Sequence, residues 1–269
     1  MKINHIHYIL SVFAMLILGS CKKEGEFLTK SVKALKPFDI TGYAIGDVLE
    51  QYFDGVKVRE YYGRVGMPSI VPELVFDSDV TVMQLKKKST GEVVYEQQFN
   101  INDAKNEVPK FYFDGNKISN TYSYPKAQGK DYLMNFFVDG PQDMGPVDIQ
   151  MDVIEYYYDS NNQVVIVNTT SIPITNNLAL GKWSENFTIA PPPILTPTQS
   201  GTDFYPFLTI KNAKTKQYLI GKTAVEGTFQ AEIPDQWTSQ GKTQSIHIQG
   251  LTENKIFYLK VNDLVQMFP

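Results

Sequence analysis

Cysteine, histidine and arginine are scarce in this sequence, and their scarcity excludes several kinds of chemistry. Cys21 is the single cysteine, so no intramolecular disulfide can form. Of the three histidines, His5 and His7 lie at the extreme N-terminus, and only His247 remains in the body of the chain. A zinc site with two or three histidine ligands cannot be built, Cys–His catalysis is excluded, and a Ser-His-Asp triad could use only His247.

Arginine occurs only as Arg59 and Arg64, so dense recognition of phosphate or carboxylate groups by guanidinium forks is not expected. Residues 1–20 hold one lysine and no acid; without them the chain has 24 basic and 29 acidic residues, a net charge of −5. Nucleic acid, whose phosphates require clustered lysine and arginine, is therefore not an expected partner. No apolar run reaches the roughly 20 residues of a membrane-spanning helix.

The first 20 residues have the layout of a secretory signal. A short positive start precedes an apolar segment over 9–18, which is interrupted only by Ser11. The next residues, Leu18-Gly19-Ser20-Cys21, resemble the lipobox of bacterial lipoproteins, Leu-x-(Gly/Ala/Ser)-Cys. This resemblance implies that residues 1–20 are removed and that Cys21 is acylated and becomes the first residue of the mature chain.

Acylation would account for the single cysteine, because an unpaired thiol is a hazard in an oxidising compartment. Acyl chains partition into membrane at about 0.8 kcal/mol per buried CH2, so several chains hold a soluble domain at a surface. The sequence therefore predicts a lipid-anchored protein of the cell envelope, in the outer membrane of a Gram-negative bacterium. An ordinary free or buried Cys21 behind an ordinary signal peptide is the alternative.

From Phe38 onward the sequence has the patterns of β-strands. The runs 49–53 and 56–59 flank Asp54-Gly55, and Asp-Gly between two such runs is a strong hairpin signal, because the turn needs positive φ. A helix over 45–53 is the alternative, since apolar residues there also have helical spacing.

Further strands are predicted over 80–85 and 92–101, where apolar and polar residues alternate with a period of two. Alternation over 147–153 predicts another half-buried strand, with Asp148, Gln150 and Asp152 on its polar face. The continuous apolar run 164–167 is typical of a central strand that is buried on both faces.

Two stretches resemble known β-sandwich families. Residues 129–136 resemble the strand that carries the tyrosine corner of immunoglobulin-like sandwiches. Residues 251–261 resemble the closing strands of fibronectin type III modules, with Tyr258 as the tyrosine of the last strand. The expected fold is thus all-β, with tandem antiparallel β-sandwich domains of the immunoglobulin-like or fibronectin III-like kind.

The positions of the prolines predict where the chain divides into domains. Residues 21–36 form a tether, although a few of them could instead make a short first strand. Residues 37–190 form one large or two small β-sandwich domains. Residues 191–200 contain a run of prolines, which favours an extended, semi-rigid linker. Residues 201–269 form a C-terminal β-sandwich domain.

Aromatic rings outside the strands are the candidates for ligand binding. Trp237 lies in the polar loop 234–241, and Tyr122 and Tyr124 lie just before Pro125. Flat rings beside amides and carboxylates suit sugars, whose C–H faces stack on the ring while their hydroxyls form hydrogen bonds. Packing of the rings over an end of a sandwich is the alternative.

No catalytic, metal-binding or cofactor-binding residue is predicted. His247 lies between Ile246 and Ile248, so it is expected to be an exposed histidine on the opposite, more polar face of a strand. Carboxylates are plentiful, but any acidic β protein offers pairs at glycosidase spacing by chance. Asp77-Ser78-Asp79 could ligate calcium, yet aspartate at a strand end is ordinary turn chemistry.

The overall layout resembles the accessory lipoproteins of starch-utilisation-type glycan uptake systems, with an acylated cysteine, a tether and tandem β domains. The resemblance implies a non-enzymatic envelope protein that binds or scaffolds, with polysaccharide or other proteins of a surface complex as partners. A purely structural or adhesive protein is the alternative, and a glycosidase is a third.

Overall fold

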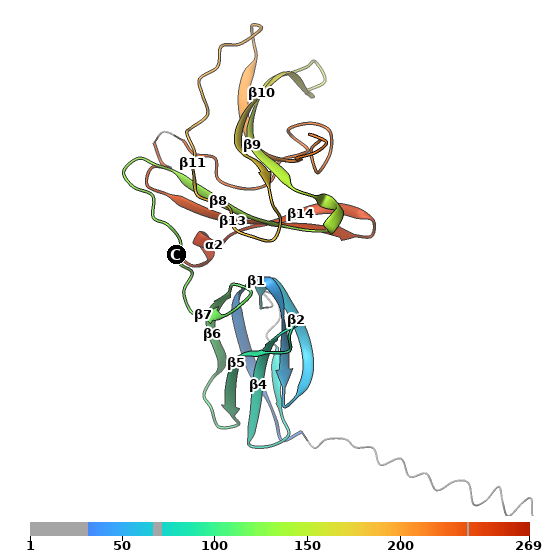
Figure 1. Cartoon of the computed structure of the whole chain (residues 1–269), viewed down its shortest axis with the longest axis vertical. Coiled ribbons are helices and arrows are strands. Elements are labelled where there is room, and N and C mark those ends of the chain that lie inside the picture. Colours follow the sequence, from blue (N-terminus) through green and yellow to red (C-terminus); the bar gives the residue numbers. More distant parts are fainter. Residues whose placement is uncertain (1–31, 67–71, 236) are drawn as a thin grey trace, which may run out of the picture.

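The computed structural model describes residues 32–66, 72–235 and 237–269, whose strands form two groups (Figure 1). The predicted signal peptide, Cys21 and most of the predicted tether lie outside these residues. The N-terminal domain comprises β1 (Ala34–Phe53), β2 (Val56–Val65), β3 (Glu73–Phe76), β4 (Val80–Lys87), β5 (Val93–Asn100), β6 (Asn106–Phe113) and β7 (Ile118–Ser119). The C-terminal domain comprises β8 (Leu133–Asp139), η1 (Gln142–Met144), β9 (Val147–Tyr158), β10 (Val164–Leu178), β11 (Phe187–Thr188), β12 (Asp203–Asn212), β13 (Thr243–Glu253), β14 (Ile256–Asp263) and α2 (Leu264–Met267). The predicted all-β class is confirmed.

The long strand β1 organises the N-terminal domain. Its first half pairs in parallel with β6, its second half pairs antiparallel with β4, and β2 runs along its other edge. The change of partner coincides with a register shift after Ala44, where Gly46 adopts a φ of 80°. A glycine there lets β1 bend and serve two parts of the sheet. The core fills with side chains from these strands, among them Leu49, Phe76, Met83, Leu85, Phe99, Phe111 and Phe113.

The predicted hairpin at Asp54-Gly55 is present, and both turn residues have positive φ, at 48° and 81°. Phe53 lies opposite Val56 across the turn, so the helix alternative over 45–53 is wrong. The predicted tether ends earlier than expected, because β1 begins at Ala34 and its first residues pair with β3. The alternative of a short first strand within the tether is therefore the correct interpretation for residues 34–36.

The C-terminal domain is a sandwich of two sheets, with strand orders β10-β9-β12 and β11-β8-β13-β14. Their facing sides form one apolar core, which includes Met134, Phe136, Val138, Val147, Ile149, Met151, Leu208, Ile210, Ile246 and Ile248. Most pairs are antiparallel, as predicted, but β8 pairs in parallel with β13 and β1 with β6. A parallel pair needs a long crossover connection, and all strands of the sheet β10-β9-β12 lie between β8 and β13 in the sequence.

Strands from both sides of the proline-rich segment 191–200 pair in the same sheets, so this segment is not a spacer between domains. β12, which follows it, pairs with β9, and β13 pairs with β8. Prolines 191–193 lack amide N–H groups and cannot continue a ladder, so the chain leaves the sheet of β11 there and joins the other sheet as β12. The carboxylate of Glu155 on β9 holds the returning chain, accepting hydrogen bonds from Thr198 and Thr202.

Two strands are buried differently from their predicted patterns. Asp148 and Asp152 on β9 are buried, because the segment that follows β12 covers this part of the face: Tyr218 donates to Asp152, and Lys216 pairs with Asp148. Strand β10, by contrast, is an edge strand that exposes Val164 and other apolar residues. The apolar run 164–167 therefore lies in an exposed edge strand, and the prediction of a central strand buried on both faces is wrong.

Candidate functional site

The two domains meet in an aromatic interface, here called the domain interface. Side chains buried in it come from both domains: Tyr43, Ile45, Tyr112, Phe137, Leu264 and Phe268, with His247 beside them. The rings of Tyr43, Tyr62 and Phe137 each meet the imidazole of His247 edge-on, with centroids 5.7, 6.0 and 5.4 Å away. The interface thus surrounds the one histidine that the structure describes.

His247 is completely buried, so the prediction of an exposed strand histidine is wrong. Its Nδ1 atom lies 2.7 Å from the Tyr43 hydroxyl, and its Nε2 atom lies 3.1 Å from Oδ2 of Asp139. The same carboxylate oxygen accepts a hydrogen bond from the hydroxyl of Tyr62. The face opposite Ile246 and Ile248 is indeed more polar, but it is turned toward the N-terminal domain.

An Asp–His–Tyr chain resembles a catalytic constellation in its connectivity, yet this one has no room for a substrate. Tyr43 and His247 both have no exposed surface. Burial, reinforced by the negative charge of Asp139, raises the pKa of the Tyr43 phenol well above its usual range, so the phenol stays neutral. These hydrogen bonds satisfy buried polar groups and join the domains.

Tyr122 and Tyr124 lie at this interface. The Tyr122 ring packs edge-on against Tyr112, at 4.8 Å, and also contacts Trp183 and Phe268. Tyr124 stacks on Tyr122, with centroids 6.0 Å apart. Burial raises the pKa of Tyr122 above its usual range. The structure therefore brings these two predicted residues together, but in the connection between the domains.

Trp237 lies apart from them and is 78% exposed. It borders a groove of about 400 Å³, here called the Trp237 groove, which is lined by Pro191, Pro192, Ile194, Tyr205, Pro206, Ile233, Pro234, Asp235 and Trp237. The groove lies where the proline-rich segment passes β12 and the loop before β13. The sequence marked Trp237 and the prolines separately, but it gave no signal that the two meet.

The loop that carries Trp237 is held by a carboxylate. Asp235 accepts hydrogen bonds from the hydroxyl and amide of Thr238 and from the amide of Trp237, with both amide nitrogens 2.6 Å away. These donors, with the Thr238 hydroxyl contributing most, lower the pKa of Asp235 to about 2. Asp235 is therefore ionised at neutral pH, and the backbone beneath the ring is fixed by the protein itself.

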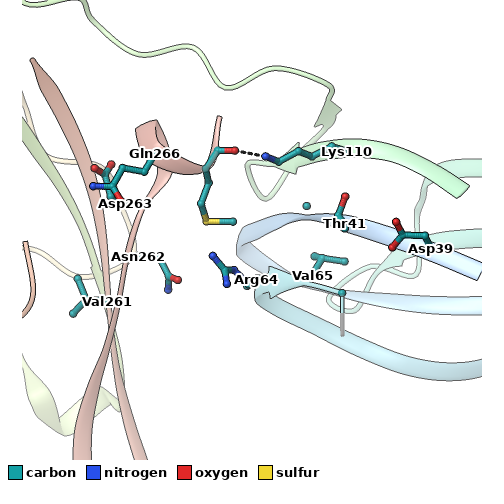
Figure 2. A pocket seen from close by; sticks show the side chains of 12 residues that line it. Asp39, Thr41, Arg64, Val65, Lys110, Val261, Asn262, Asp263 and Gln266 are labelled. Carbon is teal, nitrogen blue, oxygen red and sulfur yellow. Dashed lines mark hydrogen bonds between the residues drawn. The ribbon is translucent and has the colours of Figure 1, made fainter. Parts of the chain in front are cut away.

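A second cavity, of about 620 Å³, lies between the domains (Figure 2). Arg64 points into it from the N-terminal domain, toward Asn262. Lys110 donates to the carbonyl of Met267 and lies 4.7 Å from the ring of Phe268. Asp263 caps α2 by accepting from Val265. Lys110 and Asp263 thus bind the C-terminal residues, and the cavity borders the domain interface.

Two of the carboxylates considered for catalysis or calcium, Asp152 and Asp79, are occupied by protein partners. Asp152 accepts from Gln150, Ser171, Thr209 and Tyr218, at 2.5 to 2.8 Å. Asp79 forms an ion pair with Lys33 at 3.0 Å. Within the described ranges, no three His, Cys, Asp or Glu side chains converge as they would around a metal ion. The same part of the chain contains no helix long and apolar enough to cross a membrane.

No protein-family model and no curated protein matches this chain. Three similar solved structures come from Bacteroides. A candidate adhesin from Bacteroides ovatus is 9% identical, with 84% of this chain and 92% of that chain covered and a TM-score of 0.24. A candidate cell adhesion protein from Bacteroides fragilis is 9% identical, with coverages of 85% and 97% and a TM-score of 0.24. Another from Bacteroides uniformis is 11% identical, with coverages of 86% and 97% and a TM-score of 0.20. Similarity at this level transfers no ligand or activity.

Proposed function

We propose that this chain is a non-catalytic, lipid-anchored adhesive protein of the cell surface that contacts its partner through the Trp237 groove. The observation that carries the proposal is the exposed ring of Trp237 beside prolines and Tyr205, on a loop fixed by Asp235. Tryptophan and tyrosine dominate the energetics of binding surfaces, where truncation of a central ring costs about 2 kcal/mol or more. A pre-formed loop also reduces the entropy lost on binding.

The position of the groove relative to the chain start suits an anchored adhesin. β1 begins at Ala34, and the part of it that reaches the domain interface starts nine residues later, at Tyr43. At about 3.3 Å per residue, roughly 30 Å of strand lies between these points. The groove belongs to the C-terminal domain, on the other side of the interface. The N-terminal domain therefore separates the groove from a membrane to which Cys21 would be attached.

Glycan binding as an accessory of an uptake complex is the second candidate, and the flat exposed ring of Trp237 favours it. In this interpretation the ring stacks on a sugar, and nearby backbone carbonyl groups accept hydrogen bonds from the sugar hydroxyls. Both candidate functions use the same groove, so a single assay that offers protein surfaces and polysaccharide surfaces distinguishes them.

The adhesion test uses beads that carry residues 22–269, coupled through an added N-terminal cysteine to imitate the anchor. Their attachment is counted on immobilised fibronectin and collagen, and on dextran, pullulan and xylan. We expect attachment to at least one surface, reduced about tenfold or more by Trp237→Ala. Tyr258→Ala, which removes another partly exposed ring on β14, is the matched control. Equal attachment of Trp237→Ala and wild type, or no attachment anywhere, would refute the proposal.

The anchor is tested separately in bacteria that process lipoproteins. The full chain should incorporate radiolabelled palmitate and fractionate with the outer membrane, and Cys21→Ser should abolish both. A labelled Cys21→Ser variant would show that the lipobox interpretation is wrong, whatever the outcome of the bead assay.

A further inference from the structure

A row of aromatic side chains lies on one face of the sheet β10-β9-β12. Tyr156 and Tyr158 come from β9, and Tyr205 and Phe207 from the adjacent β12. Residues directly opposite in antiparallel strands share a face, and here Tyr205 lies opposite Ile154 and Phe207 opposite Asp152. The four aromatic residues therefore share the face of the even-numbered residues of β9. The odd-numbered residues of β9, such as Met151 and Val153, point the other way, into the core.

These rings stand together and remain partly uncovered. The ring centroids of Tyr156 and Tyr158 are 5.7 Å apart, and those of Tyr205 and Phe207 are 4.9 Å apart. Tyr158 is 57% exposed and Tyr205 is 53% exposed. The segment after β12 covers the neighbouring part of this face, where Tyr218 donates to Asp152 and Lys216 pairs with Asp148, and leaves Tyr158 and Tyr205 exposed. We call Tyr156, Tyr158, Tyr205 and Phe207 the aromatic face.

The aromatic face is continuous with the Trp237 groove, because Tyr205 belongs to both. A ligand that lies across β9 and β12 therefore reaches Trp237 without leaving an aromatic surface. The combined surface is longer than a single ring platform, which suits a chain of several units better than one small molecule.

Charge selects among the possible ligands. Residues 131–210 contain one lysine, Lys182, and no arginine, against nine carboxylates: Asp131, Asp139, Asp143, Asp148, Asp152, Glu155, Asp159, Glu185 and Asp203. Lys211, near the end of β12, shares the face of the aromatic residues but lies opposite Asp148, 4.4 Å from the centre of the Tyr218 ring. Asp203 lies directly opposite Tyr156, and Asp235 lines the groove. Lys211 and Lys216 lie at the Asp148 end of this face, where Lys216 pairs with Asp148, whereas carboxylates border the rings at the other end, so a neutral ligand suits the rings better than an anionic one.

We infer that the aromatic face and the Trp237 groove together bind one chain of a neutral polysaccharide. The apolar C–H faces of successive sugars stack on the rings, while sugar hydroxyls donate to Asp203 and exchange hydrogen bonds with the tyrosine hydroxyls. A protein partner is the less suitable occupant, because protein interfaces favour arginine beside aromatic residues, and this stretch contains no arginine. The inference rests on the proposed binding function and names its ligand class.

The test measures binding of residues 22–269 to neutral polysaccharides (dextran, pullulan, laminarin and xylan) and to anionic ones (alginate and heparin). Affinity electrophoresis and calorimetry are the readouts. We expect at least one neutral polysaccharide to bind and the anionic ones not to bind. Tyr158→Ala and Tyr205→Ala should each weaken binding about tenfold, Tyr158→Phe should retain it because the ring remains, and Tyr258→Ala should leave it unchanged. Unchanged tryptophan fluorescence would show that each variant is folded.

Three outcomes would overturn the inference: no neutral polysaccharide binds, alginate or heparin binds equally well, or Tyr158→Ala binds like wild type. If the beads nevertheless attach to fibronectin or collagen through Trp237, the adhesive function stands and only its carbohydrate ligand is rejected. If the beads attach to nothing, the proposed function itself fails.

Discussion

Two aromatic clusters of this protein are built from the same residue types and have opposite environments. The domain interface contains Tyr43, Tyr112, Tyr122 and Trp183, and the surface of the C-terminal domain contains Tyr156, Tyr158, Tyr205 and Trp237. Each cluster holds one of the two tryptophans. In the domain interface, the other domain packs against the rings and buries them. On the surface of the C-terminal domain, the rings face solvent.

The comparison shows that a surface rich in aromatic rings is buried only when a second surface packs against it. Tyr43 on β1 and Tyr112 on β6 do not belong to the main core of the N-terminal domain, whose buried residues form a separate cluster. They are buried because β8, β13 and the C-terminal residues of the other domain meet them. The aromatic face has the same construction without that opposite half, which is why we assign it to a ligand.

The largest effect is expected from breaking the buried cluster. Phe137→Ala removes a buried ring that contacts both Trp183 and His247, and it should lower the free energy of unfolding by about 3–4 kcal/mol. Urea denaturation measures this change. Trp237→Ala is the control and should stay within about 0.5 kcal/mol of wild type, because its ring is exposed. Equal losses in the two variants would contradict the comparison.

A smaller effect is expected from the hydrogen bonds alone. His247→Phe keeps a ring but leaves the Tyr43 hydroxyl and Asp139 without this partner, which should cost about 1–3 kcal/mol. Tyr43→Phe in the same background should then cost less than it does in wild type. A double-mutant cycle from urea denaturation measures the coupling, and fully additive losses would show that the two side chains act independently.

The two tryptophans allow the two environments to be compared by fluorescence. With Trp183→Phe, the remaining Trp237 should be quenched readily by acrylamide and emit at long wavelength. With Trp237→Phe, the remaining Trp183 should be quenched several-fold less and emit at shorter wavelength. Similar quenching constants would mean that the domains do not cover Trp183 in solution.

The smallest effect concerns pH. The pKa of Asp235 is lowered from 3.8 to about 2, so its hydrogen bonds to the Trp237 loop are fully present above pH 4 and are lost as pH falls through about 2. In the Trp183→Phe background, Trp237 fluorescence should therefore change near pH 2 rather than near pH 4. Asp235→Asn should remove that transition; a transition that persists would assign it to another group.

Local sequence signals predicted the elements whose structure depends on nearby residues. Asp54-Gly55 makes the expected turn because two consecutive positive φ angles are a local requirement. His247 shows the limit: alternation identified its face, but not the domain that would cover that face. Tyr122 and Trp237 both lie outside strands, and only the tertiary arrangement separates the ring in the interface from the exposed one.

The same limit explains the proline-rich segment. Prolines 191–193 correctly predict a break in strand pairing, since they lack amide donors, but a break in a ladder can lie within a domain as well as between domains. Pairing of β9 with β12 across the break is a non-local choice that depends on the complementary core of both sheets. No residue near the prolines carries that information.

The parallel pair of β8 and β13 also sets the order in which the protein can fold. All pairing partners of the N-terminal domain lie within residues 34–119, so this domain can form as soon as that part of the chain has emerged. The C-terminal domain closes only when Thr243–Glu253 arrives beside Leu133–Asp139, after more than 100 intervening residues. Contacts so distant in sequence form slowly, and until then the edge of β8 that faces β13 is unpaired. During synthesis, the C-terminal domain is thus the part that benefits most from a chaperone.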